Sequence, residues 1–259
     1  MTRQPVTPVL LLHGQPGSAA DFDLLLPLLA TSRPVLVPDR PGWGTSREPA
    51  GGFAYNASAM VRELDSSDVE RALVVGYSWG GGVALALAQD HPGRVAGLVL
   101  LSCVGPHSLE RIDRIPLVPL IGTPLTVGGF AMARAALSVV RFAQRLARRD
   151  TSAHHAWVHA LARSVDGRRA ASSFLVEQQA LFDELDTITD GLGAIRTPTI
   201  VVTGDRDHLV PSATASALVE AIPSAQLRVA RGAGHPIPLF APDEVVRAVA
   251  DIEALGRRA

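Results

Sequence analysis

Short apolar runs alternate with longer amphipathic segments along most of the chain. The apolar runs cover residues 9–12, 35–37, 73–75, 95–101, 199–202 and 227–229. Most of them end at turn-forming residues, as buried strands usually do. The segments with apolar residues at helical spacing are 21–30, 57–64, 81–89, 213–221 and 243–255. This alternation predicts an α/β fold in which helices cover both faces of a doubly wound, mostly parallel sheet.

The alternation is interrupted once, between about Gly105 and Gly193. Here the sequence has helical patterns without strand patterns, over residues 130–149, 155–163 and 170–185. We therefore expect a core domain of residues 1–104 and 194–259. Residues 105–193 are expected to form a helical cap, or lid, inserted between two core strands.

The stretch 115–133 is uncharged and nearly long enough to span a bilayer. Prolines and glycines interrupt it at Pro116, Pro119, Gly122, Pro124, Gly128 and Gly129. Because proline breaks helical hydrogen bonding, we predict that this stretch forms no transmembrane helix. Residues 115–130 are expected to line an apolar substrate pocket, which the arginine-faced helix 130–149 covers with its other face. A basic amphipathic helix that lies on a membrane or a partner is the alternative.

Composition and charge exclude several classes of protein. Hydrophobic residues make up 47% of the 259, and 24 basic residues against 25 acidic ones leave a net charge of -1. Disordered chains have fewer apolar residues, and nucleic-acid-binding proteins usually have a basic excess. All 24 basic residues are arginine, so chemistry that needs a lysine amine is excluded. We expect a small-molecule substrate, no nucleic-acid partner and no stable membrane insertion; the oligomeric state is left open.

Cys103 is the one cysteine, so the chain can form no internal disulfide. Residues 1–8 lack the apolar core of a signal peptide. Both features predict a cytoplasmic location. Because Cys103 follows an apolar strand, its thiol is expected to be buried and inert.

The clearest chemical motif is Gly76-Tyr77-Ser78-Trp79-Gly80, which follows an apolar strand and precedes a helix. A serine on a sharp strand-to-helix turn has a strained backbone, and small residues two positions before and after it avoid clashes. Its hydroxyl then projects beyond the end of the strand. This arrangement predicts a nucleophilic Ser78, with the backbone N–H of Trp79 as one donor to an oxyanion.

A serine nucleophile needs a histidine as its base, and the histidine needs a carboxylate that orients it. His235 lies in the small-residue loop 232–236, before the last helix. Two carboxylates, Asp205 and Asp207, lie in the turn after strand 199–202. The residues alone leave both carboxylates open as the third member of a Ser-His-Asp triad.

Four motifs in order resemble the α/β-hydrolase fold superfamily, over almost the whole chain. They are His13-Gly14-Gln15-Pro16-Gly17, the loop 39–46, the serine motif 76–80, and the Asp and His turns at 204–211 and 232–236. The resemblance implies Asp207 as the triad acid and Gln15 as the second backbone N–H of the oxyanion hole. It also implies that His13 is structural and that Asp39 braces the loop 41–46. Because so few residues precede strand 9–12, we expect about six main strands.

Within this superfamily, two branches share the flanking residues. Epoxide hydrolases and haloalkane dehalogenases attack with an aspartate where this chain has Ser78. Epoxide hydrolases also use cap tyrosines, and neither Tyr55 nor Tyr77 lies in the insertion. Proline iminopeptidases are also similar, and they bind the substrate amine with cap carboxylates. The candidates for that role are Glu177, Asp183 and Glu184.

No cofactor is implied, and a metal site is not expected. His154, His155 and His159 have partly helical spacing, but a histidine cluster on a cap surface is the simpler interpretation. The sequence therefore predicts a serine hydrolase that acts on an uncharged, moderately hydrophobic carboxylic ester or lactone through an acyl-enzyme. An aminopeptidase or a C–C bond hydrolase with the same triad is the alternative. A ligand-binding receptor on this fold is disfavoured because the triad is complete.

Overall fold

The computed structural model describes residues 6–109, 111–147, 152–165 and 169–256. Its sheet has six strands in the order β2-β1-β3-β4-β5-β6, and every neighbouring pair is parallel. The strands are β1 (Val9–Leu12), β2 (Val35–Leu36), β3 (Ala72–Tyr77), β4 (Val95–Leu101), β5 (Thr199–Gly204) and β6 (Ala225–Ala230). The sequence expectation of a doubly wound sheet of about six strands is confirmed.

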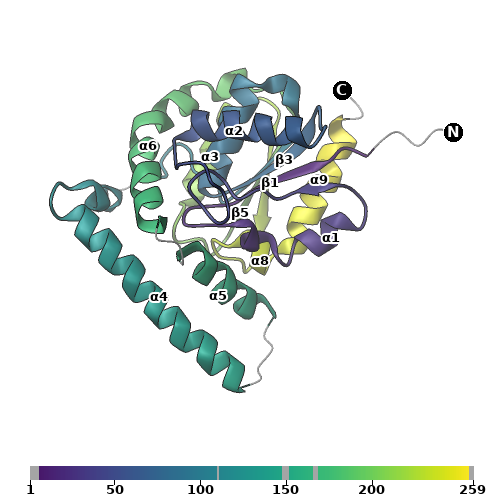
Figure 1. The fold of residues 1–259 in the computed structure, drawn as a ribbon. Coiled ribbons are helices and arrows are strands. Elements are labelled where there is room, and N and C mark those ends of the chain that lie inside the picture. Colours follow the sequence, from purple (N-terminus) through teal and green to yellow (C-terminus); the bar gives the residue numbers. More distant parts are fainter. Residues whose placement is uncertain (1–5, 110, 148–151, 166–168, 257–259) are drawn as a thin grey trace.

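Helices cover both faces of this sheet (Figure 1). The helices of the core are α1 (Leu26–Ala30), α2 (Phe53–Ser66), α3 (Trp79–Asp90), α7 (Ser212–Ala221), α8 (Ile237–Phe240) and α9 (Pro242–Gly256). Alternate residues of β1 belong to the two apolar clusters: Leu10 belongs to the cluster that includes residues of α2 and α3, whereas Leu11 belongs to the one that includes residues of α9. All four β1 residues are fully buried, which explains why the central strands are apolar without alternation.

Two helices differ from the boundaries that the sequence pattern indicates. In place of one helix over residues 21–30, the chain has a short 3-10 helix, η1 (Ala19–Phe22), and then the separate helix α1. The interruption precedes Pro27, which lies in the first turn of α1 and lacks the N–H that a continuous helix needs. Helix α2 begins at Phe53, four residues earlier than expected, with Gly52 as its N-cap.

Among its described residues, the segment between β4 and β5 contains helices and connecting turns but no strand. It contains η3 (Arg111–Leu117), α4 (Gly122–Ala147), α5 (Ser152–Val165), α6 (Ala170–Asp190) and η4 (Leu192–Ala194). Figure 1 shows α6 against the core and the long α4 at the edge of the molecule, with α5 nearer the sheet. Helix α4 begins eight residues before the expected start at 130. Pro124 is tolerated because the first-turn N–H groups of a helix have no intrahelical partner.

The expected position of residues 115–130 is wrong. Leu120 and Leu125 have 96% and 56% of their surface exposed, and no residue of this stretch lines the pocket beside Ser78. Gly122–Phe142 is also long and apolar enough to cross a membrane by length and composition, and only 6% of its most apolar window is buried. Of the prolines and glycines that were expected to break this segment, Pro116 lies in η3 and Pro119 in the turn that follows it. The others lie within the continuous helix α4. Helix α4 packs mainly against η3, α5 and α6.

Candidate active site

Ser78 lies at the sharp turn between β3 and α3, with φ +53° and ψ −119°. This backbone conformation is strained for any residue other than glycine. The neighbouring glycines are required by close backbone approach. A Cβ at Gly76 would lie 2.6 Å from the carbonyl oxygen of Gly80, and a Cβ at Gly80 would lie 2.4 Å from that of His13. The turn that the Gly-x-Ser-x-Gly motif predicts is therefore confirmed in its local geometry.

Ser78, His235 and Asp207 form a continuous hydrogen-bonded row. The Oγ atom of Ser78 lies 3.0 Å from Nε2 of His235, and Nδ1 of His235 lies 2.9 Å from Oδ2 of Asp207. A carboxylate beside Nδ1 favours the tautomer in which Nδ1 bears the proton. Nε2 is then free to accept the proton of the serine hydroxyl, which is the geometry that general-base catalysis needs.

The two candidate carboxylates have different partners. Oδ1 of Asp207 also accepts hydrogen bonds from the backbone N–H groups of Leu209 and Val210, at 2.9 and 3.0 Å. Burial opposes ionisation of Asp207, but the hydrogen bond and charge of His235 prevail and lower its pKa to about 2. Asp205 instead accepts from the backbone N–H of Gly232 at 2.6 Å. The structure therefore places Asp207, and not Asp205, against the histidine.

A pocket of about 220 Å³ opens beside Ser78 and His235. Most of its walls are apolar, and helices α5 and α8 supply much of the lining. The lining residues are Gln15, Pro16, Asp21, Tyr77, Ser78, Trp157, Ala160, Leu161, Ser164, Leu209, His235, Pro236, Pro238 and Leu239. The pocket wall that was expected from residues 115–130 thus comes from α5, because α4 packs outside α5.

Two ionisable side chains that line this pocket, Asp21 and Tyr77, have a raised pKa. Burial raises the pKa of Asp21 to about 7, although hydrogen bonds from backbone N–H groups of Gly14 and Ser18 oppose the shift. Burial, followed by the charges of Asp21 and Asp207, raises the pKa of Tyr77 well above its usual value. The Tyr77 ring lies 5.3 Å from the His235 ring, so a neutral phenol packs against the candidate base.

The loop after β1 lies directly against the candidate nucleophile. A Cβ at Gly14 would lie 3.2 Å from the Cβ of Ser78, so only glycine fits without displacing its neighbours. His13 is fully buried; its Nε2 accepts the backbone N–H of Arg40 at 2.9 Å, and its Nδ1 lies 2.9 Å from the carbonyl oxygen of Gly14. Burial and the charge of Arg40 lower the pKa of His13 to about 3. The structural role expected for His13 is confirmed.

Asp39 has the bracing role that was expected. Its carboxylate accepts hydrogen bonds from the backbone N–H groups of Ala19 and Thr45, at 2.8 and 2.7 Å, and from the Thr45 hydroxyl.

Cys103 is buried, and burial raises the pKa of its thiol. A Cβ at Gly81 would lie 2.3 Å from its Sγ, so the thiol packs against the start of α3.

The cap carboxylates do not face the pocket. Glu177 is fully buried against Arg40, Glu184 accepts from the backbone N–H groups at the start of α2, and Asp183 accepts from Gln179. An amine-binding role for these three residues is therefore wrong for this structure.

Within the described ranges, no group of three or more histidine, cysteine or acidic side chains could hold a metal ion.

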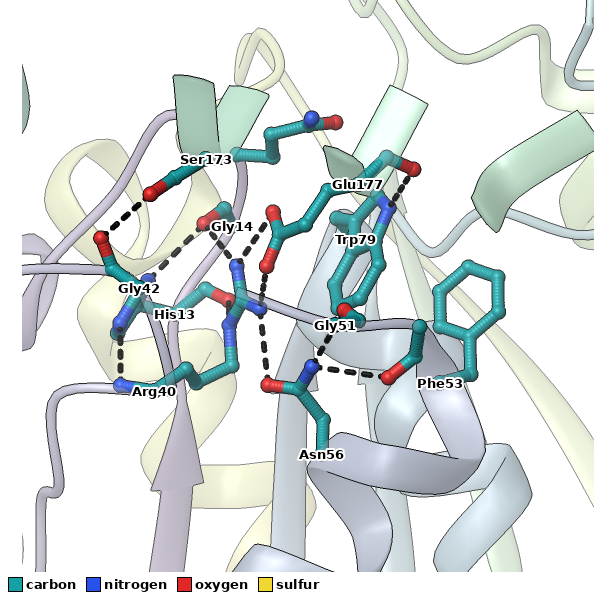
Figure 2. Close-up of polar contacts among 12 residues, drawn as sticks. His13, Gly14, Arg40, Gly42, Gly51, Phe53, Asn56, Trp79, Ser173 and Glu177 are labelled. Carbon is teal, nitrogen blue, oxygen red and sulfur yellow. Dashed lines mark hydrogen bonds and ion pairs between the residues drawn. The ribbon is translucent and has the colours of Figure 1, made fainter. Parts of the chain in front are cut away.

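Sequence reasoning missed Arg40, which is fully buried against the loop that follows β1 (Figure 2). Its guanidinium donates to the carbonyl oxygens of His13 and Gly14, to Asn56 and to Glu177. An arginine inside an apolar strand-to-loop segment was the available signal. Its acidic partner lies 137 residues away, and only folding brings the two together.

Comparison with known proteins gives a consistent family. A family profile described as alpha/beta hydrolase fold matches residues 7–242. A 2-hydroxymuconate semialdehyde hydrolase of Pseudomonas sp. (strain CF600) is 32% identical over an alignment of 244 residues that covers 88% of this chain and 80% of that protein. A non-heme chloroperoxidase of Streptomyces lividans is 33% identical over an alignment of 251 residues that covers 88% of this chain and 84% of that protein.

The solved structures agree at the level of the fold. A thermophilic esterase from Thermogutta terrifontis superposes with a TM-score of 0.73 at 23% identity, covering 97% of this chain and 91% of that one. The six-stranded parallel sheet, the serine turn after β3 and the profile match all point the same way. The chain belongs to the α/β-hydrolase fold family.

Proposed function

We propose that this protein is a serine hydrolase in which Ser78 is the nucleophile, His235 the base and Asp207 the residue that orients the base. The observation that supports this most directly is the row of hydrogen bonds from Ser78 Oγ through His235 to Asp207, which ends at an apolar pocket. Substrate enters that pocket with its carbonyl carbon near Ser78 Oγ. The arrangement is the one that nucleophilic acyl transfer needs.

The reaction proceeds in two halves. Ser78 Oγ attacks the carbonyl carbon while Nε2 of His235 takes the hydroxyl proton, and a tetrahedral oxyanion forms. The imidazolium then gives that proton to the leaving alcohol, the C–O bond breaks, and Ser78 is acylated. Water attacks the acyl-enzyme with His235 again as base, which releases the acid and restores Ser78.

The oxyanion is stabilised by two backbone N–H groups, those of Trp79 and Gln15. Trp79 is the first residue of α3, where N–H groups have no helical partner and the helix dipole favours negative charge. Gln15 lines the pocket beside Ser78. Preorganised donors of this kind contribute roughly 10²–10³-fold each to the rate.

An uncharged ester or lactone with a small to medium acyl group fits the pocket. Its volume is about 220 Å³, and residues such as Trp157, Leu161 and Leu239 make most of its wall apolar. Asp21 and Ser164 are polar groups that lie in the wall near Ser78. An acyl chain is therefore bound mainly by burial of apolar surface.

Hydrolysis of a C–C bond is the second candidate, because the 32% identical Pseudomonas relative is named a semialdehyde hydrolase and a 30% identical one a heptadienoate hydrolase. A dienoate bears a carboxylate. The described lining of the pocket holds no arginine that would pair with it. Esters and lactones are therefore the first choice. An aminopeptidase is disfavoured because Glu177, Asp183 and Glu184 lie outside the pocket.

The test is a series of p-nitrophenyl esters of increasing acyl length, assayed with wild type, Ser78→Ala and Ser216→Ala. Ser216 is an exposed serine on α7 and serves as the matched control. We expect Ser78→Ala to abolish both turnover and labelling by a fluorophosphonate, with Ser216→Ala unchanged. Ester turnover that survives Ser78→Ala would refute the proposal.

The same proteins decide between the candidate reactions. A ring-opened 6-oxo-dienoate tests C–C bond hydrolysis, and a prolyl arylamide tests aminopeptidase activity. Higher kcat/KM for the dienoate than for every ester would make the C–C hydrolase the correct assignment. A ligand that raises the melting temperature without being consumed would support a receptor instead.

A further inference from the structure

The guanidinium of Arg40 binds the two carbonyl groups that precede Gln15. Nε donates to the carbonyl oxygen of His13 at 2.9 Å, and Nη2 donates to that of Gly14 at 2.8 Å. Nη1 also donates to Oδ1 of Asn56 at 3.2 Å. Figure 2 shows this side chain at the centre of the buried polar network. Arg40 therefore holds the backbone that precedes the proposed donor Gln15, and it does not itself line the pocket.

The bond to Gly14 bears directly on the Gln15 donor. The carbonyl of Gly14 and the N–H of Gln15 belong to one planar trans peptide group, so they point in opposite directions. Anchoring the oxygen on Arg40 thus sets the direction of the N–H. A cationic donor on the carbonyl also polarises the peptide group and makes its N–H a stronger donor.

Arg40 also contacts the residue that supplies the other donor. Its guanidinium carbon lies 4.4 Å from the centre of the Trp79 ring, and the Phe53 ring stacks on the same indole at 4.3 Å. The indole lies between these two groups in Figure 2. The backbone N–H of Trp79 follows Ser78. One buried cation therefore contacts the Trp79 ring and the carbonyl of the peptide group that supplies the Gln15 N–H.

Helix α6 supplies the counter-charge. Oε1 and Oε2 of Glu177 accept from Nη1 and Nη2 of Arg40, and both side chains are fully buried. The same helix makes two further contacts with the loops around the site. The hydroxyl of Ser173 donates to the carbonyl of Gly42 at 2.7 Å, and the side chain of Gln15 donates to the carbonyl of Phe174 at 2.9 Å.

We infer that Arg40 is a positioning residue for the oxyanion hole, and that Glu177 couples its position to the docking of α6 on the core. The inference rests on the proposed function, because it assigns a role in stabilising the oxyanion. Without Glu177, Arg40 would be an unpaired buried charge and would leave its place. Removing α6 from the core therefore also disorganises the Gly14–Gln15 peptide.

The decisive variant is Arg40→Met/Glu177→Met, which removes the ion pair while retaining apolar volume. Replacement of a buried pair by apolar residues usually leaves a protein folded. The matched control is Arg33→Met/Glu253→Met, which removes another mostly buried Arg–Glu pair, of 3.0 Å, between distant segments. We expect kcat of the Arg40/Glu177 variant to fall about 100-fold, with KM within about twofold of wild type. The control keeps its kcat.

A boronic acid that forms a tetrahedral adduct with Ser78 separates positioning from general damage. Its affinity is expected to fall by the same factor as kcat/KM, whereas affinity for the product carboxylate stays unchanged. In ¹⁵N-glutamine-labelled protein, the backbone amide resonance of Gln15 is expected to move in the Arg40/Glu177 variant and not in the control. Glu177→Gln, which keeps the shape of the side chain, gives a smaller effect in the same direction and decides the question if the double variant does not fold.

The outcomes separate the two proposals. Wild-type protein that neither hydrolyses esters nor reacts with a fluorophosphonate refutes the proposed function. Active wild type together with an Arg40/Glu177 variant whose kcat, boronate affinity and Gln15 resonance match the control overturns the positioning role alone. A parallel loss of kcat and of product binding would show general damage to the site, and it would overturn the inference as well.

Discussion

Asp205 accepts a hydrogen bond from the backbone N–H of Gly232 at 2.6 Å, and so ties the turn after β5 to the loop that carries His235. Asp207, two residues further on, contacts His235 itself. The two carboxylates thus have separate tasks. One holds the loop, and the other orients the ring.

Asp207→Asn is expected to lower kcat by about 10³–10⁴-fold, because the amide favours the wrong tautomer of His235. Asp205→Asn is expected to lower kcat by about tenfold or less, since it only loosens the loop. Steady-state kinetics on one ester, with circular dichroism to verify folding, compares the two. Equal losses would mean that Asp205 also acts on the histidine.

Asp21 makes stability fall as pH rises. Its folded-state pKa is raised from 3.8 to about 7, so the folded chain holds a proton that the unfolded chain has lost. Folded protein is therefore destabilised progressively between about pH 4 and pH 7. Asp21→Asn removes this penalty while keeping an oxygen for the N–H groups of Gly14 and Ser18.

The measurement is the melting temperature of wild type and Asp21→Asn from pH 4 to pH 8. We expect the advantage of the variant over wild type to grow with pH through this window and to level off above it. A constant difference between the two proteins at all pH values would contradict the assignment. Asp186→Asn, a change at an exposed carboxylate of α6 that does not contribute to the shift at Asp21, is the control.

Ser78 stores backbone strain that glycine would relieve. Ser78→Gly and Ser78→Ala both remove the nucleophile, but only glycine adopts φ +53° and ψ −119° at little cost. Relief of the strain in Ser78→Gly is worth about 1 kcal/mol or more of folding free energy relative to Ser78→Ala. The higher conformational entropy of glycine in the unfolded chain offsets part of this gain, and we expect Ser78→Gly to remain the more stable variant. Urea unfolding of the two inactive variants measures the difference. Equal stability would show that the turn is unstrained.

We expect Trp157 on α5 to limit the length of acyl chain that the pocket accepts. The residue lines the pocket and is 38% exposed, so its truncation opens space without unfolding the core. Trp157→Ala is expected to shift the optimum of the ester series towards longer chains. Val176→Ala, at an exposed position of α6 away from the pocket, is expected to leave the optimum unchanged. An unaltered profile in Trp157→Ala would place the acyl chain elsewhere.

The sequence determined the features that depend on neighbouring residues. Apolar runs such as 73–75 and 199–202 indicate buried strands, because a strand that is covered on both faces does not need to alternate polar and apolar residues. The serine turn was predictable because Gly76 avoids a clash with the carbonyl oxygen of Gly80, which belongs to the same five-residue motif. The sequence order of the serine, aspartate and histidine turns was also readable, since the ends of parallel strands meet at one edge of the sheet.

The tertiary structure decided what depends on packing between distant segments. Arg40 and Glu177 lie 137 positions apart, and their hydrogen bonds give no local pattern. The sequence therefore indicated Glu177 only as a candidate to bind a substrate amine, whereas the packing of α6 on the core pairs it with Arg40. Residues 115–130 have the composition of a pocket wall, yet α5 occupies that place and α4 lies outside it. An apolar composition indicates that burial of a segment is favourable. Which of two apolar helices is buried in the cleft depends on how they pack against the core in the folded protein.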